Sequence, residues 1–525
     1  MVSTGDQFLQ LLENMAPIHF DAALPLLDKL RTHWPFLIPI LLIARFTYFR
    51  FFHPLSRVPG PFVASISRLW LLKLALSGRQ HLDFMEAHRK YGPVVRVAPN
   101  AVIINDPENF QHYHYFDKSE WWLALRAQPD HVPHSTELDQ RAHNVKKKRV
   151  SGAFSMSSVL KLESKADAII AKFIEQLSTK FADTGAVCEL SAWTHWVAFD
   201  IVMDLVFSAK PGFVEHAKDV NGLIASLHYL LNTAQFVAMH PVIMKILYIP
   251  FINRHLAPQP TDKKGPGLVN GFAYTQVRER FSNDTTKEPK SDILQSIIDY
   301  RDREGDNTHQ KTIENEAVGP VLAGSDTTAT VLRAAVLYVA TNPRILRTLL
   351  AELDAAVASG NLSRPIVQHD QVRKLPYLDA VIQESLRIHP VSGAPMYRVV
   401  PHSGVVFNGY ALPGGTQIGL LHWSASRNKD VYGDDVEVFR PERWLDLDEE
   451  TKRRRRQNEV WFGQGAMRCT GMNVALMELY KIVPELFLNF EIEVANPVQP
   501  WKEENYLNFV MKDFFILLRR REMAA

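Results

Sequence analysis

The stretch W-F-G-Q-G-A-M-R-C-T-G, residues Trp461–Gly471, decides how the rest of the chain is interpreted. It places Cys469 between glycine-rich segments, directly ahead of Met472–Phe490, a run with helical character. Glycines let the backbone approach a side chain closely, and amide N–H groups at a helix N-terminus favour a thiolate. A cysteine in this setting can be a nucleophile, a redox centre or a metal ligand.

Composition limits the function classes. The chain has 525 residues, of which 46% are hydrophobic and 22% charged, so it can bury a large core. A net charge of +2 gives no general case for nucleic-acid binding. Two cysteines exclude a disulfide scaffold and suit a reducing compartment. The second cysteine, Cys188, is expected to be an inert buried thiol.

The cysteine stretch resembles the haem-binding signature of the cytochrome P-450 family, the haem-thiolate monooxygenases. Four residues match that signature: Phe462, Gly465, Cys469 and Gly471. The family's basic residue two positions before the cysteine is replaced by Met467, and Arg468 follows it. The resemblance implies that the Cys469 thiolate binds the iron of haem b and makes Arg468 a candidate for the propionate contact.

A second motif lies within Thr312–Thr341, which the sequence predicts to be a long helix. Its segment A-G-S-D-T-T, Ala323–Thr328, contains poor helix formers, and a Thr hydroxyl can bond back to an earlier carbonyl and open a groove. Pro320 is expected to bend the entry of this helix. The segment is similar to the family's acid–alcohol motif, which implies that Asp326 and Thr327 deliver protons to bound dioxygen.

A third motif is a Glu–Arg pair on the predicted amphipathic helix Leu375–Ile388. Glu384 and Arg387 are three residues apart, a spacing that other Glu–Arg pairs of this chain share, so the spacing alone carries little information. The resemblance implies that both join Arg443, in F-R-P-E-R-W, as a buried ion-pair triad under the haem. A buried pair costs several kcal/mol to break, whereas a surface pair contributes only tenths.

Basic residues elsewhere are candidates for the haem propionates. His143 and Lys147 lie one helical turn apart in H-N-V-K-K-K-R and can together present donors to an anion, although most of this run is expected to be a solvated helix face. The resemblance implies that these two residues grip one propionate and that Arg398 reaches the second. Arg398 lies in Val391–Pro413, where alternating residues predict strands.

Other segments extend the same interpretation. Val94–Ile104 predicts a hairpin, and Glu120–Thr136 a loop with a short helix. Lys452–Arg456, five basic residues in a row, is expected to be a solvated loop near the docking site of an acidic redox partner; a nuclear signal is the weaker alternative. Asn496–Arg521 predicts strands, and its pattern resembles fungal microsomal members such as the pisatin demethylase group.

The N-terminal region divides into three expected segments. Residues 1–33 lack the basic start of a signal peptide. Residues 34–52 are long enough for a membrane anchor although two arginines interrupt them; a buried or surface-lying amphipathic helix is the alternative. Residues 53–62 form a proline-rich hinge, and residues 63–525 are the expected haem-thiolate catalytic domain. The arginines favour a cytosolic catalytic domain, and the resemblance to microsomal members implies an anchor in the endoplasmic reticulum membrane.

The resemblance implies a mainly α (α+β) cytochrome P-450 fold, with a large helical lobe, a smaller β-rich lobe and an N-terminal membrane anchor. It implies a monooxygenase that hydroxylates, epoxidises or dealkylates a lipophilic small molecule in fungal secondary metabolism. NADPH electrons should come through a partner flavoprotein reductase, with cytochrome b5 as a further candidate donor, because the chain lacks a flavin or nicotinamide signature. Two alternatives are a family member that rearranges or dehydrates its substrate without dioxygen, and a catalytically silent haem-binding protein.

Overall fold

The computed structural model describes residues 36–105, 113–282 and 290–522. The predicted N-terminal segment, residues 1–33, lies outside the described residues, as do the first two residues of the predicted anchor. The described residues fall into two units, which are divided between Arg57 and Val58.

In the first unit, residues 36–47 form an α-helix that passes into a π-helical turn, η1 (Tyr48–Phe52). Most side chains of residues 36–47 are exposed. His53 adopts an extended backbone, and a 3-10 turn follows, η2 (Pro54–Arg57). Proline cannot continue an α-helix, so the helix ends where the sequence predicts.

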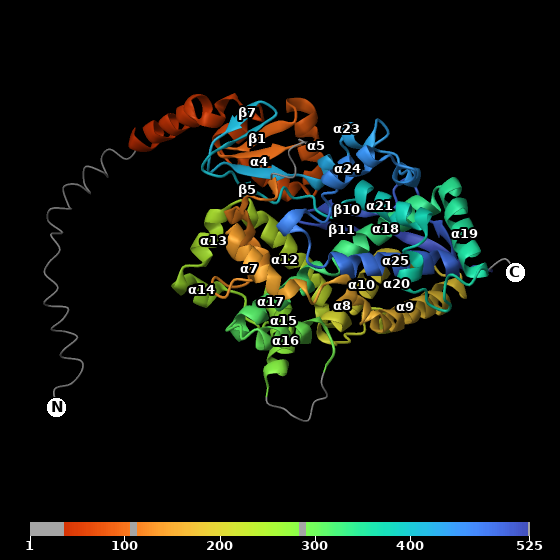
Figure 1. The fold of residues 1–525 in the computed structure, drawn as a ribbon. Helices are drawn as coiled ribbons and strands as arrows, with labels where there is room; N and C mark the ends of the chain where they lie inside the picture. The colour runs from red at the N-terminus through yellow and green to blue at the C-terminus, as the bar shows by residue number, and fades with distance from the viewer. Residues whose placement is uncertain (1–35, 106–112, 283–289, 523–525) are drawn as a thin grey trace, which may run out of the picture. The chain divides into compact units, whose positions relative to one another are not determined.

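Helices make up most of the second unit, which has a large helical lobe and a smaller β-rich lobe, as predicted (Figure 1). The helices before and within the β-rich lobe are α3 (Phe62–Ile66), α4 (Leu69–Ser77), α5 (Gln80–Tyr91), α22 (His422–Ala425) and α23 (Lys429–Tyr432). The remaining helices are, in chain order, α7 (Gln140–Ser151), α8 (Met156–Leu160), α9 (Glu163–Leu177), α10 (Leu190–Phe207), α11 (Phe213–His216), α12 (Leu223–Ala238), α13 (Pro241–Leu247), α14 (Pro250–Leu256), α15 (Gly265–Phe281), α16 (Ile293–Arg303), α17 (Gln310–Ala323), α18 (Asp326–Ala340), α19 (Pro343–Ala358), α20 (His369–Val372), α21 (Pro376–Ile388), α24 (Glu449–Asn458) and α25 (Met472–Asn489).

The largest sheet has the strand order β1-β2-β8-β5-β3. Its strands are β1 (Val94–Ala98), β2 (Ala101–Ile104), β3 (Asp117–Lys118), β5 (Arg398–Val399) and β8 (Gln417–Leu420). The β1–β2 pair is antiparallel and confirms the predicted hairpin. β8 runs parallel to β2 and antiparallel to β5, and β5 in turn pairs with β3. This pairing brings residues about 280 positions apart in the chain side by side at the edge of the sheet.

Smaller sheets hold the C-terminal strands that the sequence predicts. Their strands are β4 (Cys188–Glu189), β6 (Val405–Phe407), β7 (Tyr410–Leu412), β9 (Phe490–Val494), β10 (Lys502–Asn505), β11 (Phe509–Lys512) and β12 (Phe515–Arg520). β12 lies between β4 and β9, while β10 pairs with β11 and β6 with β7. Cys188 in β4 is fully buried, and burial raises the pKa of its thiol, as expected for an inert cysteine.

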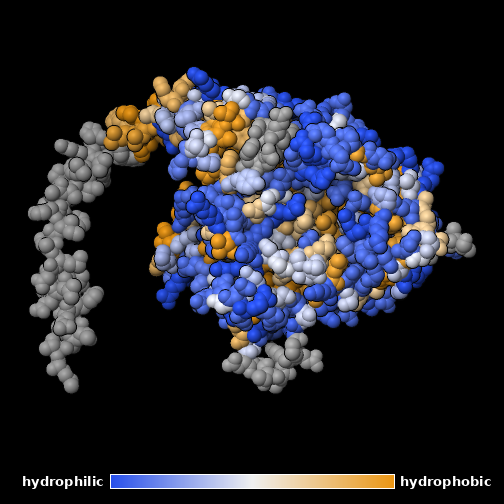
Figure 2. Space-filling model, in the orientation of Figure 1, coloured by the Kyte–Doolittle hydropathy of each residue, from blue (hydrophilic) through white to orange (hydrophobic). Residues whose placement is uncertain are grey.

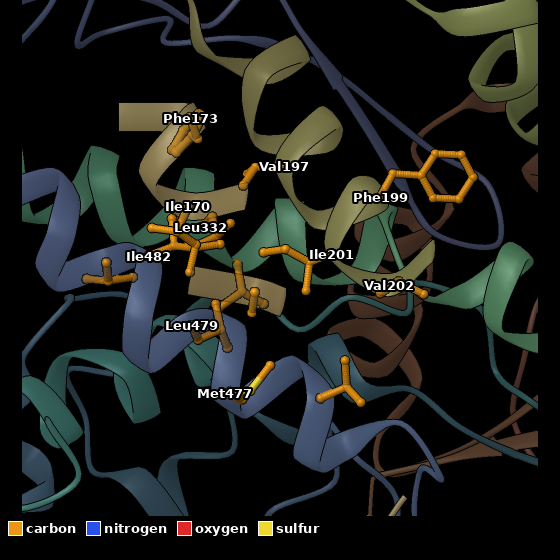
Figure 3. Close-up of a cluster of buried hydrophobic side chains, with 14 of the residues drawn as sticks. Ile170, Phe173, Val197, Phe199, Ile201, Val202, Leu332, Met477, Leu479 and Ile482 are labelled. Carbon is orange, nitrogen blue, oxygen red and sulfur yellow. The ribbon is translucent and has the colours of Figure 1, made fainter. Parts of the chain in front are cut away.

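The main core lies where α9, α10, α18 and α25 pack together (Figure 3). Apolar side chains from these four helices interdigitate there: Ile170, Phe173, Val197, Ile201, Leu332, Met477, Leu479 and Ile482. Among the described helices, α10 is long and apolar enough to cross a membrane, but 89% of it is buried inside the protein. A helix that is apolar on every side and covered by its neighbours is a core helix. The helical segment Val220–Ala238 and α13 are together also long and apolar enough to cross a membrane, but the chain bends by 109° between them.

The predicted central helix is broken in the middle, as its motif indicates. α17 ends at Ala323, α18 begins at Asp326, and Thr327 Oγ1 donates a hydrogen bond to Ala323 O at 2.7 Å. Gly324 lies so close to α10 that a Cβ would be 2.6 Å from Val202 Cγ1. The break therefore combines a back-bonding hydroxyl with a glycine that permits close helix packing.

The basic run Lys452–Arg456 lies in a helix, α24, and the prediction of a loop there was wrong. Asp448 caps this helix by accepting a hydrogen bond from Thr451 N–H. Acidic residues of the first turn pair with basic residues three positions later, as in Glu450–Arg453, so the positive charges are partly neutralised within the helix. Arg455 is buried and does not face solvent with its neighbours.

Candidate functional site

Cys469 lies at the end of a turn-rich loop that leads into α25. Its N–H donates to Phe462 O at 2.6 Å, which closes the loop. Gly463 and Gly465 have φ values of +65° and +55°, and a Cβ on Gly463 would lie 2.9 Å from Met467 O. Glycine is thus required for the backbone conformation of this loop.

Cys469 is an exposed residue by its solvent-accessible area, but protein atoms lie densely in a wider shell around its sulfur. Burial raises the pKa of the Cys469 thiol, while the backbone N–H of Gly471, the Lys147 charge and the N–H of Met472 act in the opposite direction. The amides at the start of α25 therefore favour the thiolate, as expected, but burial outweighs them. A coordinated metal ion is the kind of partner that deprotonates such a thiol outright.

Two buried cations lie side by side in the sheet. The register of β3 and β5 pairs Lys118 with Arg398, and each residue is 4% exposed. Arg398 Nη1 lies 3.4 Å from Met467 Sδ, and Arg398 Nε has no hydrogen-bond partner. Within the described residues, neither cation forms an ion pair with a carboxylate. Burial lowers the pKa of Arg398, and burial together with the Arg398 and Lys147 charges lowers the pKa of Lys118 well below its usual range.

Lys118 is a residue that the sequence analysis missed. It lies in D-K-S-E-W-W, which has no pattern of its own, and only the pairing of β3 with β5 brings it to Arg398. Because such pairing joins distant segments, no local signal in the sequence could have identified it.

The predicted propionate residues of α7 contact the same loop. His143 Nε2 lies 3.1 Å from Ala466 O, and His143 Nδ1 lies 3.0 Å from Lys118 Nζ. Lys147 Nζ donates to Ala466 O at 2.9 Å and also to Arg468 O. Burial and the Lys118 charge lower the pKa of His143 to about 4. The structure thus brings these two residues together with Lys118, next to the cysteine loop.

Arg468 lies apart from this group. Its side chain lines an open surface depression together with Arg453, Arg456 and Gln464. Met467 instead points its sulfur at the Arg398 guanidinium. A basic side chain at position 467 would add a further positive charge beside Arg398, which gives a physical reason for the neutral residue.

The predicted Glu384–Arg387–Arg443 group is assembled and fully buried. Glu384 accepts two hydrogen bonds from Arg387, at 2.7 and 2.8 Å, and all three side chains are 0% exposed. Arg443 Nε lies 3.4 Å from Glu384 Oε1 and its Nη1 lies 2.8 Å from Asp435 Oδ1. Trp444 Nε1 also donates to Glu384 Oε2, at 2.8 Å. Every oxygen of the buried carboxylate therefore has a donor.

The acid of the second motif is buried between helices. Asp326 Oδ1 lies 3.2 Å from His195 Nδ1 of α10 and 3.1 Å from His228 Nε2 of α12. Burial opposes ionisation of Asp326, but these imidazoles outweigh it and hold the pKa of the carboxyl below its usual range. Neither histidine was expected from the sequence, because each comes from a different helix.

The donor set around Cys469 fits a haem group. A haem needs an axial ligand for its iron and cations for its two propionates. The Cys469 thiol can serve as the iron ligand. The buried side chains of Lys118 and Arg398, which form no ion pair with an acid in the described residues, can serve the propionates.

Comparison with known proteins identifies the family of the chain. The cytochrome P-450 family pattern matches residues 59–515. The chain is 32% identical over 495 residues to the cytochrome P-450 monooxygenase cicH of Emericella nidulans, covering 92% of this chain and 97% of that protein. It is 32% identical over 513 residues to the cytochrome P-450 monooxygenase ABA1 of Pyricularia oryzae, covering 94% and 98%. It is 31% identical over 529 residues to pisatin demethylase of Fusarium vanettenii, covering 95% and 99%.

The fold and the site therefore define a haem-thiolate protein. The chain belongs to the cytochrome P-450 family, and it is a monooxygenase of that family with a haem-thiolate cofactor, a redox partner and a small-molecule substrate.

Proposed function

We propose that this monooxygenase inserts one oxygen atom into a lipophilic small molecule and that the Cys469 thiolate would hold the haem iron. The observation that carries the proposal is the exposed Cys469 thiol next to buried cations that lack acid partners. Lys118, Arg398 and the α7 pair His143 and Lys147 are the residues that would hold the propionates.

When bound, the haem supplies the activation of dioxygen and the transfer of one oxygen atom to the substrate. The chain contributes binding and proton handling around it. The Gly463 and Gly465 turns present the cysteine, and the buried cations fix the orientation of the cofactor by charge. Asp326 holds or releases a proton at its carboxylate, and Thr327, whose hydroxyl opens the helix, offers the next oxygen atom.

We propose that electrons come from NADPH through a flavoprotein reductase, with cytochrome b5 as a further candidate donor. Support comes from the depression lined by Arg453, Arg456 and Arg468, which lies on the cysteine loop and α24. A basic surface attracts an acidic partner and speeds their encounter.

We propose a location on the endoplasmic reticulum membrane, with residues 34–52 as a single N-terminal anchor, 53–62 as hinge and a cytosolic catalytic domain. Exposed apolar side chains of the described part of that anchor support this, among them Phe36, Ile40 and Leu41. In the second unit, α3, α4, α13 and α14 also expose large apolar side chains, including Phe62, Leu69, Phe251 and Leu256. The visible face is otherwise largely hydrophilic (Figure 2).

We place the substrate among fungal secondary metabolites, because the similar proteins are fungal monooxygenases and one of them is named for demethylating pisatin. A family member that rearranges or dehydrates its substrate without dioxygen is the second candidate. The intact Asp326–Thr327 pair favours oxygen insertion over that candidate.

The test combines a spectrum with turnover. The reduced carbon monoxide complex of the purified protein is expected to show the Soret band of thiolate ligation. Extracts of a strain that lacks this chain should accumulate the substrate, and microsomes with NADPH, reductase and labelled dioxygen should convert it with one labelled oxygen atom. A band typical of histidine ligation would contradict the haem-thiolate site, and conversion without label would establish the second candidate.

Replacing Lys118 by methionine is expected to affect the two forms of the protein differently. In the haem-free protein it removes a buried amine whose pKa is already lowered by burial, and it also removes the hydrogen bond to His134 O, so the free energy of unfolding should change by less than about 1 kcal/mol. In the haem-loaded protein it removes a charged donor, so haem should dissociate about 10-fold faster or more. Urea unfolding and haem transfer to apomyoglobin measure the two effects.

The matched control is Lys146→Met, since Lys146 lies on α7 and pairs with Glu137 outside the cation group. This variant should leave the rate of haem loss unchanged. Equal haem retention in wild type and Lys118→Met would remove Lys118 from the propionate site.

A further inference from the structure

A carboxylate and two imidazoles form a buried cluster at the start of α18. Asp326 Oδ1 is shared by His195 and His228, and the three side chains offer ligand atoms within 4.8 Å of one another. Asp326 Oδ2 is buried and has no hydrogen-bond partner. The carboxylate is thus held firmly through one oxygen, while the other is free to act on a neighbouring group.

The two imidazoles differ in their surroundings. His195 uses both ring nitrogens, because its Nε2 lies 3.0 Å from Ser325 Oγ. Burial lowers the pKa of His195 to about 3 even though Asp326 acts against this, so the ring stays neutral. The His228 side chain is 21% exposed, and within the described residues its Nδ1 has no protein hydrogen bond. Only His228 can therefore exchange a proton with solvent.

The charges around His228 come from several elements. Burial lowers the pKa of His228, but Asp326 on α18 outweighs this and raises the pKa above its usual value. Arg333 on α18 and Lys512 on β11 act in the opposite direction, and His195 on α10 lies 5.3 Å away between ring centroids. Arg333 is fixed by a hydrogen bond from its Nε to Thr194 Oγ1 at 2.9 Å, so its influence is constant.

We propose that His228 carries protons from solvent to Asp326, and that His195 is the positioning residue that holds Asp326 in place. The inference rests on the proposed function, in which Asp326 supplies protons at the haem site. A hydronium ion in solvent protonates His228 at Nδ1, so the ring becomes a cation with N–H bonds at both nitrogens. The Nε2–H bond then breaks as an O–H bond forms on Asp326 Oδ1. Rotation of the now neutral carboxyl presents this proton on the unbonded side, and the neutral His228 ring turns outward and takes its next proton from hydronium at Nε2. One proton moves and no electron is transferred.

The test uses the haem-loaded full chain with NADPH and reductase, in the absence of substrate. The wild-type rate of NADPH oxidation is expected to fall as pH rises through the pKa of His228, because the ring then loses the proton that it donates. His228→Gln should be at least about tenfold slower at neutral pH and should lose this pH dependence, since glutamine cannot carry a proton. Hydrogen peroxide release, followed in parallel, reports the same step.

A second measurement does not depend on turnover. Since the pKa of His228 is raised in the folded protein, its pairing with Asp326 adds stability below the ordinary histidine pKa of about 6.5. That stability is lost as pH rises through the folded-state value. The thermal unfolding midpoint of wild type should follow this trend, and the midpoint of His228→Gln should not.

Two variants separate the roles. His195→Gln should slow NADPH oxidation but keep its pH dependence, because His228 remains. His402→Gln, at an exposed histidine of the loop after β5, should match wild type in both measurements. A pH profile in His228→Gln that is unchanged, in a protein that retains the thiolate band, would overturn the relay alone. Absence of that band in wild type would overturn the proposed function and the relay with it.

Discussion

Replacing Cys469 by alanine is expected to abolish the thiolate Soret band of the reduced carbon monoxide complex and all measurable monooxygenase turnover. A Cys469 thiolate would hold the haem iron and supply the electron density that favours O–O bond cleavage, and alanine has no ligand atom. The loop itself should persist, because Cys469 N–H, which closes it on Phe462 O, belongs to the backbone. Difference spectra and turnover of matched preparations measure the effect.

Cys188→Ala is the matched control, since Cys188 is the only other cysteine of the chain. It is fully buried in β4, so its truncation should lower the free energy of unfolding by about 1 kcal/mol without affecting the spectrum. A thiolate band that survives in Cys469→Ala but is lost in Cys188→Ala would reassign the axial ligand.

Local patterns in the sequence predicted the parts of the site that one segment builds. The break at Ala323–Thr328 follows from a glycine and a back-bonding threonine within the motif itself, and the structure has both. The same holds for the hairpin over Val94–Ile104, whose turn residues lie between its strands.

Contacts between distant segments could not be predicted from local patterns, and the contact of Glu384 with Arg443 was expected only from the family resemblance. Lys118 meets Arg398 only because β3 pairs with β5, and His228 meets Asp326 only because their side chains reach one another from α12 and from the start of α18. The depth at which a residue is buried also cannot be predicted from the local sequence. At Cys469 burial outweighs the favourable amides of the helix start, and the pKa of the thiol rises where the sequence indicated stabilisation of the thiolate.

The Glu–Arg pairs of this chain show that the contribution of an ion pair to stability depends on its burial. Glu384–Arg387, Glu86–Arg89 and Glu450–Arg453 all form ion pairs with the same spacing of three residues. The first pair is 0% exposed, whereas every side chain of the other two is more than half exposed. Identical local patterns therefore have very different energetic weight, and only the tertiary structure distinguishes them.

Replacing Glu384 by glutamine is expected to lower the free energy of unfolding by about 3–5 kcal/mol, because it leaves the buried Arg387 guanidinium without its carboxylate, whereas Arg443 keeps its pair with Asp435. Arg387 would keep its hydrogen bonds to Ser426 O and Val436 O, but its charge would have no counter-ion in a site that water does not reach. Against a typical total of 5–15 kcal/mol, this loss should greatly reduce the yield of folded, haem-loaded protein. Urea unfolding of the haem-free protein and haem content per chain are the measurements.

Glu450→Gln provides the control for this prediction, because it makes the same chemical change in a pair with the same spacing. Glu450 is 69% exposed, and water and salt screen its interaction with Arg453, so no measurable change in unfolding is expected. Arg387→Lys gives a further comparison: it keeps the charge but loses the two-point contact with Glu384, so its effect should lie between wild type and Glu384→Gln. If Glu384→Gln unfolded at the same urea concentration as Glu450→Gln, the buried triad would not be what stabilises this part of the fold.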